Sequence, residues 1–362
     1  MAVHRHSVLG IMSGSSLDGA DLACCRFTID TEAVDPIRSW EIEAAETVAY
    51  ASEWQDRLRA STLLPAPELS ALDVELGAWL GDQVTAFLRR NPASRPTLIG
   101  CHGHTVYHEP RRGFTLQIGS GAAIAARTGL TTVTELRSAD IAAGGEGAPL
   151  APVADRHLFP GYAAFLNLGG ILNFSLRRAD GTFLAGDLSG CCQILDRLAA
   201  VEGQPYDRDG TLARSGSLLP DLLVRLADLP FHARPSPKSL SNQWVTDTLW
   251  PVVRDWPAPA ADRLHTFVEF LAATVSTALG EHVTRSAEAV LVTGGGANNG
   301  YLLERLRHHL PVSLEAPERI ADFKEAALVA LCALLRRHRL PNSLASATGA
   351  ARDTVNGAVY AA

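Results

Sequence analysis

A glycine- and serine-rich stretch near the start of the chain has residues that could bind phosphate. It reads Gly10-Ile-Met-Ser-Gly-Ser-Ser-Leu-Asp-Gly-Ala-Asp21 and lies between two apolar segments, residues 7–10 and 22–27. Glycine lets the backbone turn sharply and approach a ligand closely, and serine hydroxyls add donors beside the backbone N–H groups. The stretch therefore predicts a β-hairpin connection that cradles phosphate. An ordinary hairpin loop is the alternative.

Carboxylates and histidines in the first half of the chain could serve a metal ion or a substrate. Asp18 and Asp21 end the glycine-rich stretch, and a carboxylate beside phosphate oxygens can hold magnesium directly or through water. His102, His104 and His108 follow a short predicted strand, residues 97–100. Ligands bind at that end of strands in open α/β sheets, so we expect these histidines to line a substrate pocket. Structural histidines and a metal cluster are the alternatives.

A polar, glycine-rich segment, residues 135–149, is predicted to be an unstructured loop that contacts a ligand. Arg137 could clamp a carboxylate bidentately, and Asp140 could accept hydrogen bonds from sugar hydroxyls. A solvated surface loop is the alternative.

The second half of the chain repeats the glycine hairpin and adds a candidate base. Residues 164–176 read as a strand, a Gly-Gly turn and a strand, so two similar domains would hold a nucleotide in the cleft between them. Asp187 stands at a predicted strand end, where a carboxylate can act as general base or can cap the following helix. Residues 293–300 contain three consecutive glycines and stand between a buried strand and a helix. This arrangement lets a flat nucleotide base lie against bare backbone and a phosphate lie at the helix N-terminus. Lys238 and Glu325 are the remaining charges of interest.

The elements that must position these residues alternate between strand-like and helix-like segments, which is typical of an α/β protein. The chain has 362 residues, so we expect two domains, residues 1–158 and 159–362, with the last helices packing back toward the first domain. Helices are predicted over residues 69–88, 122–127, 218–226, 264–279, 302–310 and 322–337.

Composition excludes several classes of protein. Hydrophobic residues make up 47% and charged residues 20% of the chain, as in a globular protein. A net charge of −7 with scattered basic residues argues against nucleic-acid binding. The longest apolar run, residues 326–335, is too short to span a membrane, and no signal peptide is evident, so we expect a cytoplasmic protein. The cysteines have no C-x-x-C spacing that would indicate zinc or a disulfide framework.

Taken together, these motifs resemble the anhydro-N-acetylmuramic acid kinase family of the sugar kinase, Hsp70 and actin superfamily. The first stretch is similar to the family pattern G-x-M-S-G-T-S-x-D-G-x-D, and the histidine segment to H-G-Q-T-x-x-H-x-P. Arg137-Ser-Ala-Asp140 with Gly144-Gly-Glu-Gly-Ala-Pro-Leu150 is similar to R-x-x-D-x-A-x-G-G-Q-G-A-P-L. Asn167-Leu-Gly-Gly-Ile-Leu-Asn173 and Gly294-Gly-Gly-Ala-Asn298 look like the second phosphate motif and the adenosine motif.

The resemblance implies a two-domain actin-like ATPase fold and a reaction with two coupled parts. Water opens the bridge of a 1,6-anhydro sugar, and the released oxygen at position six takes the γ-phosphoryl group of ATP. Asp187 would be the base and Glu325 a carboxylate close to the sugar, while Asp18 would position Mg²⁺. The residues implied for ATP are Gly10, Ser13, Gly14, Ser15, Ser16, Asp18, Gly19, Asn167, Gly169, Gly170, Gly294, Gly295, Gly296 and Asn298. Those implied for the sugar are His102, His104, His108, Arg137, Asp140, Glu146 and Lys238.

The chain departs from the family pattern beside the implied base. Asp187-Leu-Ser-Gly-Cys-Cys192 stands where the family has D-T-G-P-G-N, and His104 and Glu146 each replace a glutamine. A thiol donates and accepts hydrogen bonds poorly compared with an amide. A kinase for a different sugar and a non-catalytic nucleotide- or sugar-binding protein therefore stay open as alternatives, and the sequence also leaves a homodimer open.

Overall fold

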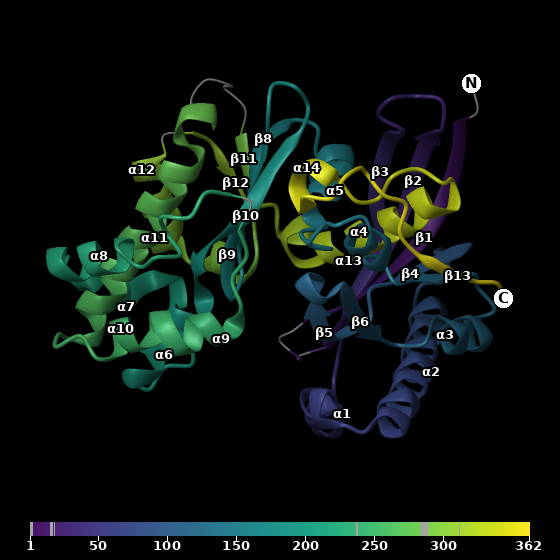
Figure 1. The fold of residues 1–362 in the computed structure, drawn as a ribbon, viewed down its shortest axis with the longest axis horizontal. Helices are drawn as coiled ribbons and strands as arrows, with labels where there is room; N and C mark the ends of the chain where they lie inside the picture. The colour runs from purple at the N-terminus through teal and green to yellow at the C-terminus, as the bar shows by residue number, and fades with distance from the viewer. Residues whose placement is uncertain (1–2, 15–16, 18, 237, 284–288, 311) are drawn as a thin grey trace. The chain divides into compact units, whose positions relative to one another are not determined.

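The computed structural model describes residues 3–14, 17, 19–236, 238–283, 289–310 and 312–362. Packing of the backbone divides the chain into two compact units (Figure 1). Unit 1 comprises Met1–Pro160 and Phe323–Ala362, and unit 2 comprises Gly161–Asp322. The chain thus passes from unit 1 to unit 2 and returns, and its last helices group with unit 1.

Unit 1 is built on a six-stranded sheet with the order β13-β7-β4-β1-β2-β3. The strands β1, β2 and β3 are antiparallel neighbours, whereas β4 and β7 continue the sheet in parallel with β1. Ser13 pairs with Ala20 at the end of the β1–β2 ladder, which confirms the predicted hairpin. The strand bounds are β1 Val3–Ser13, β2 Gly19–Asp30, β3 Ile37–Ala49, β4 Leu98–Cys101, β7 Thr132–Thr134 and β13 Ala358–Tyr360.

The helices predicted in unit 1 are present, and one predicted loop needs a correction. The long helix α2 starts at Ala66, has Pro67 in its first turn and ends at Arg90, before Asn91-Pro92, as its sequence signals predict. Segment 135–149 is not wholly unstructured, because a short helix, α4, interrupts it. The bounds are α1 Ser52–Arg59, α2 Ala66–Arg90, α3 Gly121–Thr128, α4 Ser138–Ala142, α5 Ala151–Leu158 and α14 Ala345–Thr348, with a small sheet of β5 His104–Glu109 and β6 Phe114–Ile118. Helix α13, Glu318–Arg337, belongs to unit 1 from Phe323 onward.

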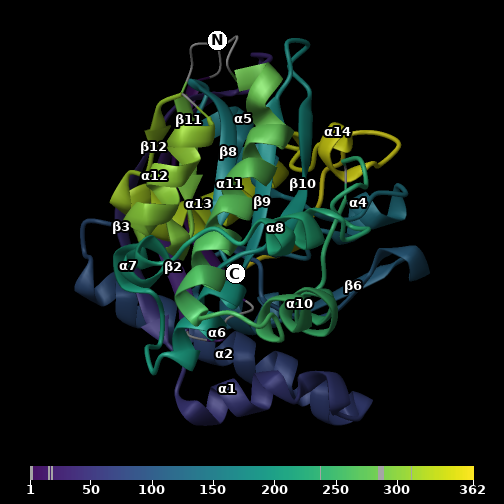
Figure 2. The ribbon, with the colours of Figure 1, turned by 90° about the vertical axis from the view of Figure 1, so that its left-hand side faces the viewer.

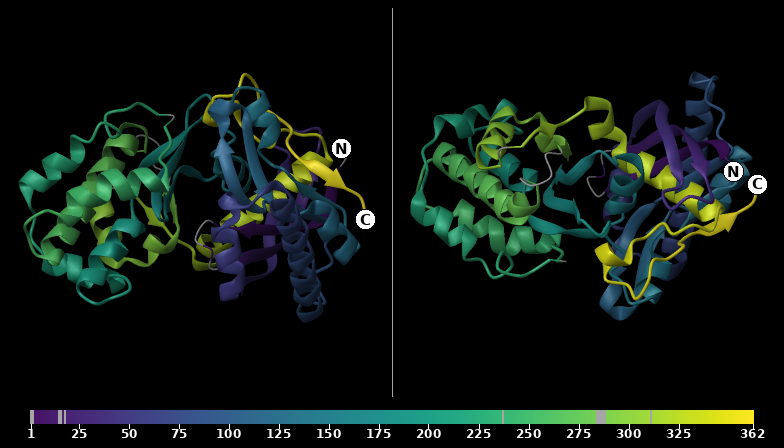
Figure 3. Two further views of the ribbon diagram at one scale, coloured as in Figure 1. Left: turned by 60° about the horizontal axis from the view of Figure 1, so that its bottom comes forward. Right: turned by 90° about the horizontal axis from the view of Figure 1, so that it is seen from above.

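Two glycines let helix α13 lie directly on the sheet of unit 1, as both views of Figure 3 show. A Cβ atom on Gly10 would lie 1.8 Å from the carbonyl oxygen of Ala326, and one on Gly100 would lie 2.4 Å from that of Val329. Real Cβ contacts are never this short, so no other residue fits at either position without moving the helix. The close approach involves Ala326, so its neighbour Glu325 lies near the strand that leads into the glycine-rich hairpin.

Unit 2 has a five-stranded sheet with the order β10-β9-β8-β11-β12. Its first three strands are antiparallel neighbours, and β11 and β12 continue in parallel with β8, so both units use the same strand arrangement. Helix α11 lies beside this sheet in Figure 2. The bounds are β8 Tyr162–Leu168, β9 Ile171–Arg177, β10 Phe183–Gly190, β11 Ala289–Thr293, β12 Leu314–Glu315, α6 Cys192–Val201, α7 Thr211–Ser215, α8 Pro220–Ala227, α9 Asn242–Trp244, α10 Trp250–Arg254, α11 Ala260–Val283 and α12 Gly300–His309.

Two α/β units, each with its own core and each built on three antiparallel strands followed by two parallel ones, confirm the expected fold class of a two-domain actin-like ATPase. Within the described ranges, every helix is too short or too polar to cross a lipid bilayer.

Candidate functional site

The end of the first hairpin is only partly described. Ser15, Ser16 and Asp18, expected at the ATP phosphates and the metal, lie outside the described residues. Ser13 is buried, and its Oγ accepts a hydrogen bond from the Tyr50 hydroxyl at 2.9 Å. Tyr50 had no signal in the sequence that linked it to this hairpin. It fixes the Ser13 side chain where the loop begins.

Gly10 and Gly19 are needed for contacts within the protein. Gly10 lies under helix α13, and a Cβ on Gly19 would be 2.5 Å from the carbonyl oxygen of Val48 in strand β3. Both glycines are buried, whereas Gly14 is half-buried at the start of the loop. The two outer glycines therefore shape the hairpin and its surroundings, and Gly14 is the most exposed of the three.

His102 and Arg137 form a rigid pair in unit 1. Arg137 donates from Nε and Nη2 to His102 Nε2, at 3.0 and 2.9 Å, and from Nη1 to the carbonyl oxygen of Gly147 at 2.7 Å. His102 Nδ1 lies 2.9 Å from the carbonyl oxygen of Gly103, so the proton of this imidazole is on Nδ1. Burial, followed by the charge of Arg137, lowers the pKa of His102 to about 3. His102 is therefore a neutral acceptor that orients the guanidinium.

His108 and Glu146 join this pair, but His104 does not. His108 is exposed by surface area, yet partial desolvation, followed by the charge of Arg137, lowers its pKa. The charge of Glu146 and a hydrogen bond with its backbone oppose this shift. His104 is buried and has a backbone partner at Leu58. Among the described residues, no group of three His, Cys, Asp or Glu side chains is arranged to hold a metal.

Asp140 holds two loops of unit 1 together. Its side chain is 0% exposed and accepts hydrogen bonds from Ser343 Oγ at 2.7 Å, Thr348 Oγ1 at 2.8 Å and the backbone N–H of Gly147 at 2.8 Å. These donors occupy both carboxylate oxygens. The geometry gives Asp140 a positioning role for the Arg137 loop and leaves it no open face toward a sugar hydroxyl. Nothing in the local sequence around Asp140 pointed to partners two hundred residues away.

Glu325 stands among other charges of unit 1. Burial raises its pKa, and the charge of Asp21 raises it further, whereas Lys324 and Arg137 lower it. The side chain is nonetheless exposed, so water screens these charges in part. Asp21 accepts a hydrogen bond from Thr47 Oγ1 at 2.6 Å. A cation or a proton would relieve the repulsion between Asp21 and Glu325.

Asp187 lies inside strand β10 of unit 2, beside a β-bulge between Asp187 and Ser189. Helix α6 has Cys191 at its N-cap, so the alternative that Asp187 caps this helix is wrong. Asp187 Oδ2 accepts a hydrogen bond from the backbone N–H of Leu240 at 2.6 Å. Burial nevertheless raises the pKa of Asp187 to about 6, against the effect of that hydrogen bond. A bulge re-aims a side chain, and a carboxylate with a pKa near neutrality suits a general base.

The Lys238 side chain makes its contacts with Phe231 and His232. Its Nζ donates to the carbonyl oxygens of Phe231 and His232 at 3.2 Å and lies 4.6 Å from the centre of the Phe231 ring. Its own carbonyl oxygen accepts from the backbone N–H of Asp187 at 2.8 Å. In this structure the Lys238 backbone, together with Leu240, braces the candidate base.

The glycine motifs of unit 2 meet, although about 125 positions separate them in the sequence. A Cβ on Gly294 would lie 2.5 Å from Asn167 Oδ1 and 2.9 Å from the backbone nitrogen of Gly169. Gly294 also has a φ of +84°, which favours glycine. The members of this cluster are Asn167, Gly169, Gly170, Gly294, Gly295, Gly296 and Asn298. Gly295 and Asn298 are exposed, so bare backbone and an amide are open to a ligand.

The departure from the family pattern leaves this cluster intact. The backbone N–H groups of Cys191 and Cys192 donate to the carbonyl oxygens of Gly170 and Gly169, at 2.8 and 3.0 Å. The Cys192 thiol donates to the carbonyl oxygen of Leu168 at 3.3 Å. The segment therefore ties the Gly-Gly turn to helix α6 through its backbone, whatever its side chains are.

Known proteins resemble this chain along its whole length. The family described as AnmK, anhydro-N-acetylmuramic acid kinase, matches residues 6–362. The anhydro-N-acetylmuramic acid kinase of Vibrio cholerae is 34% identical over 379 aligned positions, covering 98% of each chain. That of Xanthomonas oryzae pv. oryzae is 37% identical over 376 positions, covering 98% of this chain and 97% of its own.

A match from residue 6 to the last residue, with the same order of motifs on a two-unit α/β fold, leaves one conclusion about ancestry. The chain belongs to the anhydro-N-acetylmuramic acid kinase family.

Proposed function

We propose that this chain is an ATP-dependent kinase that converts 1,6-anhydro-N-acetylmuramic acid to N-acetylmuramic acid 6-phosphate, as in the recycling of cell-wall sugar. A water molecule gives a proton to the base, its oxygen bonds to the anomeric carbon, and the bond from that carbon to O6 breaks. O6 then takes the γ-phosphoryl group, and ADP leaves. The family membership and the full-length relatives support this activity.

The observation that carries the mechanism is Asp187. It is the described carboxylate of unit 2 whose pKa burial raises to about 6, and it lies beside a bulge in β10. A base of this pKa is ionised at neutral pH and still strong enough to take a proton from water. We assign it the activation of water.

We propose that the sugar is recognised by unit 1. The acidic side group of a muramic acid is a carboxylate, which an arginine can bind bidentately. The hydrogen bonds to His102 and Gly147 use one N–H on each nitrogen of Arg137, so each terminal nitrogen has a further N–H for a ligand. His108, Glu146 and Glu325 supply the remaining polar contacts. Asp140 acts through the loop that it holds.

We propose that Gly14, Ser15 and Ser16 of unit 1 and the glycine cluster of unit 2 are nucleotide-binding motifs. Magnesium keeps several waters and needs only one or two carboxylates besides the phosphates. The charge of Asp21 raises the pKa of Glu325. A cation would relieve this negative charge, so the residues present fit the ion, with Asp18 as its predicted ligand. Bound Mg²⁺ would neutralise phosphate charge, and the chain's own part is positioning. We also place the enzyme in the cytoplasm, because its six cysteines are free thiols.

The test is mass spectrometry of the product formed in heavy-oxygen water with ATP and the anhydro sugar. We expect one heavy oxygen at the anomeric position and one phosphate at O6. Asp187→Asn should abolish both, while Asp221→Asn, an exposed acid of helix α8, should not. Phosphorylation without incorporation of heavy oxygen, or full activity of Asp187→Asn, would contradict the mechanism. A panel of other sugars tests the alternative that the kinase acts on a different sugar. Product formed from another sugar, but not from 1,6-anhydro-N-acetylmuramic acid, would exclude the proposed substrate.

A further inference from the structure

Three histidines gather at the end of unit 1 where strand β1 begins and helix α13 ends. His4 and His6 are two residues apart on β1 and therefore share a face of the strand. His338 follows the last turn of α13. The ring centres lie 5.0 Å apart for His6 and His338, 6.1 Å for His4 and His338, and 6.2 Å for His4 and His6. None of them has a part in the kinase chemistry described above.

The facing nitrogens of His6 and His338 have the spacing of metal ligands. Nε2 of His6 lies 3.1 Å from Nε2 of His338. At most one proton can lie between two nitrogens so placed, so at least one of the two presents a lone pair to the other. Imidazole binds zinc at about 2.0–2.1 Å, which puts two ligand nitrogens of a tetrahedral site about 3.3 Å apart. The observed pair is within a few tenths of an ångström of that value.

His4 is close enough to complete the set. Two imidazoles on one tetrahedral metal have their ring centres about 5 Å apart, and His4 is about 1 Å farther than that from each of the other rings. The described residues contain no three-ligand group that is already arranged for a metal. His4 is exposed, however, and a change of rotamer on an exposed strand residue costs little.

We propose that His4, His6 and His338 form a binding site for a divalent transition metal that prefers imidazole, such as Zn²⁺ or Ni²⁺. The two-residue spacing on a strand supplies two ligands from one face, and the end of α13 supplies the third. A metal here joins the first strand of unit 1 to the end of the helix that lies on its sheet. Water fills the open coordination position, because the site is at the surface.

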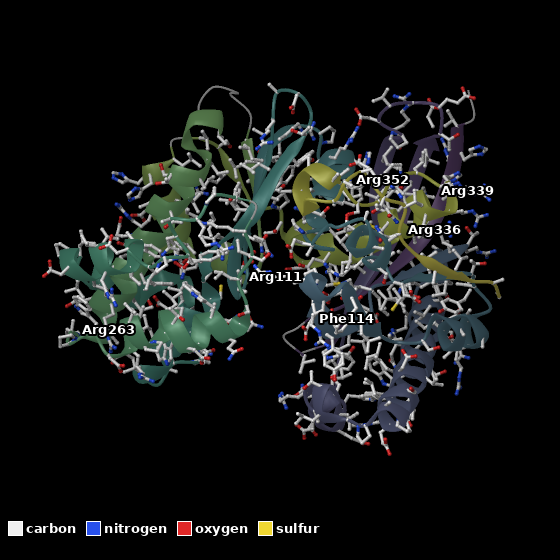
Figure 4. The ribbon with its side chains drawn as sticks, in the orientation of Figure 1. Arg111, Phe114, Arg263, Arg336, Arg339 and Arg352 are labelled. Carbon is white, nitrogen blue, oxygen red and sulfur yellow. The ribbon has the colours of Figure 1, made fainter. Side chains whose placement is uncertain are left out.

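One neighbouring charge opposes this site and offers a further test. Arg337 acts electrostatically on both His6 and His338. Arg336 and Arg339, labelled in Figure 4, also flank His338 in the sequence, and Arg336 Nε is engaged with the carbonyl oxygen of Gly357 at 2.8 Å. Removing the positive charge of Arg337, which is exposed, should therefore strengthen metal binding.

The experiment is titration of the full chain, without a histidine tag, with zinc chloride and nickel chloride in a calorimeter. We expect one site per chain. His338→Ala and His4→Ala should each weaken binding by at least about tenfold, the least effect seen for changes around a metal. His308→Ala, an exposed histidine of α12, is the matched control and should bind as the unchanged chain does. Arg337→Ala should bind severalfold more tightly.

A second measurement separates loss of a ligand from loss of the fold. Metal should raise the melting temperature of the unchanged chain and of His308→Ala, but not that of His338→Ala. His338→Ala should retain kinase activity in metal-chelated buffer containing Mg²⁺, because His338 is outside the proposed machinery. Unaltered zinc and nickel affinity in either His338→Ala or His4→Ala would overturn the three-histidine site, as would equal weakening in His308→Ala.

Discussion

Replacing Asp187 by asparagine should make the protein more stable at alkaline pH while it abolishes activity. Burial raises the pKa of Asp187 from an ordinary value of 3.8 to about 6. One pKa unit corresponds to about 1.4 kcal/mol, so keeping this carboxylate ionised costs the folded state about 3 kcal/mol at pH 8. Asparagine has nearly the same shape, can still accept from Leu240, and carries no charge to bury.

The sign of the effect fixes the pH window. Because the folded pKa is the higher one, the protonated carboxyl favours folding, and this contribution is complete below pH 3.8. It is lost as the pH rises through about 6. The difference in unfolding free energy between Asp187→Asn and the unchanged chain should therefore be small near pH 4, grow up to about pH 6, and stay constant above it.

Hydrogen exchange followed by mass spectrometry can measure this difference within unit 2. Peptides from β8, β9 and β10 report the opening of the sheet that contains Asp187, without requiring both units to unfold together. Over the same pH range, kcat/KM of the unchanged enzyme should fall about tenfold for each pH unit below 6, as expected for a base with this pKa.

Two results would refute this reasoning. The first is a lower stability of Asp187→Asn than of the unchanged chain at pH 8, which would mean that the hydrogen bond from Leu240 outweighs the burial of charge. The second is a stability difference that does not vary with pH, which would mean that the carboxylate is not desolvated in the folded protein. Asp221→Asn serves as control and should show no pH-dependent gain, since its side chain is exposed.

Three further predictions concern unit 1. Gly10→Ala must displace helix α13 at an overpacking cost of about 1–3 kcal/mol, so the melting temperature should fall by roughly 3–10 °C. Gly161→Ala is the control, because no atom lies within 4 Å of its added Cβ, and it should change the melting temperature by less than about 2 °C. Asp140→Ala leaves buried donors unpaired and should cost about 3–5 kcal/mol in urea unfolding; a loss below about 1 kcal/mol would contradict its positioning role. Arg137→Lys cannot reproduce the fork that binds His102, so steady-state kinetics should show KM for the sugar rising at least tenfold while KM for ATP is unchanged, and equal changes in both would exclude a sugar contact.

The local sequence determined the elements and the kinds of chemistry. The hairpin between β1 and β2, the first turn of α2 with Pro67, and the glycine turn after β8 all follow from residue types a few positions apart. Such signals are local, because turns, caps and apolar periodicity depend on neighbours in the chain. The order of motifs was sufficient to indicate the family.

Only the tertiary structure decided which of these residues face a ligand. Gly10 serves the contact with α13, some 316 positions away, and Asp140 is saturated by Ser343 and Thr348. Asp187 owes its raised pKa to burial within unit 2, a property of the whole packing around it. A residue type fixes which bonds a side chain can form, but its partners and its exposure come from segments distant in sequence, and these are set only when the chain folds.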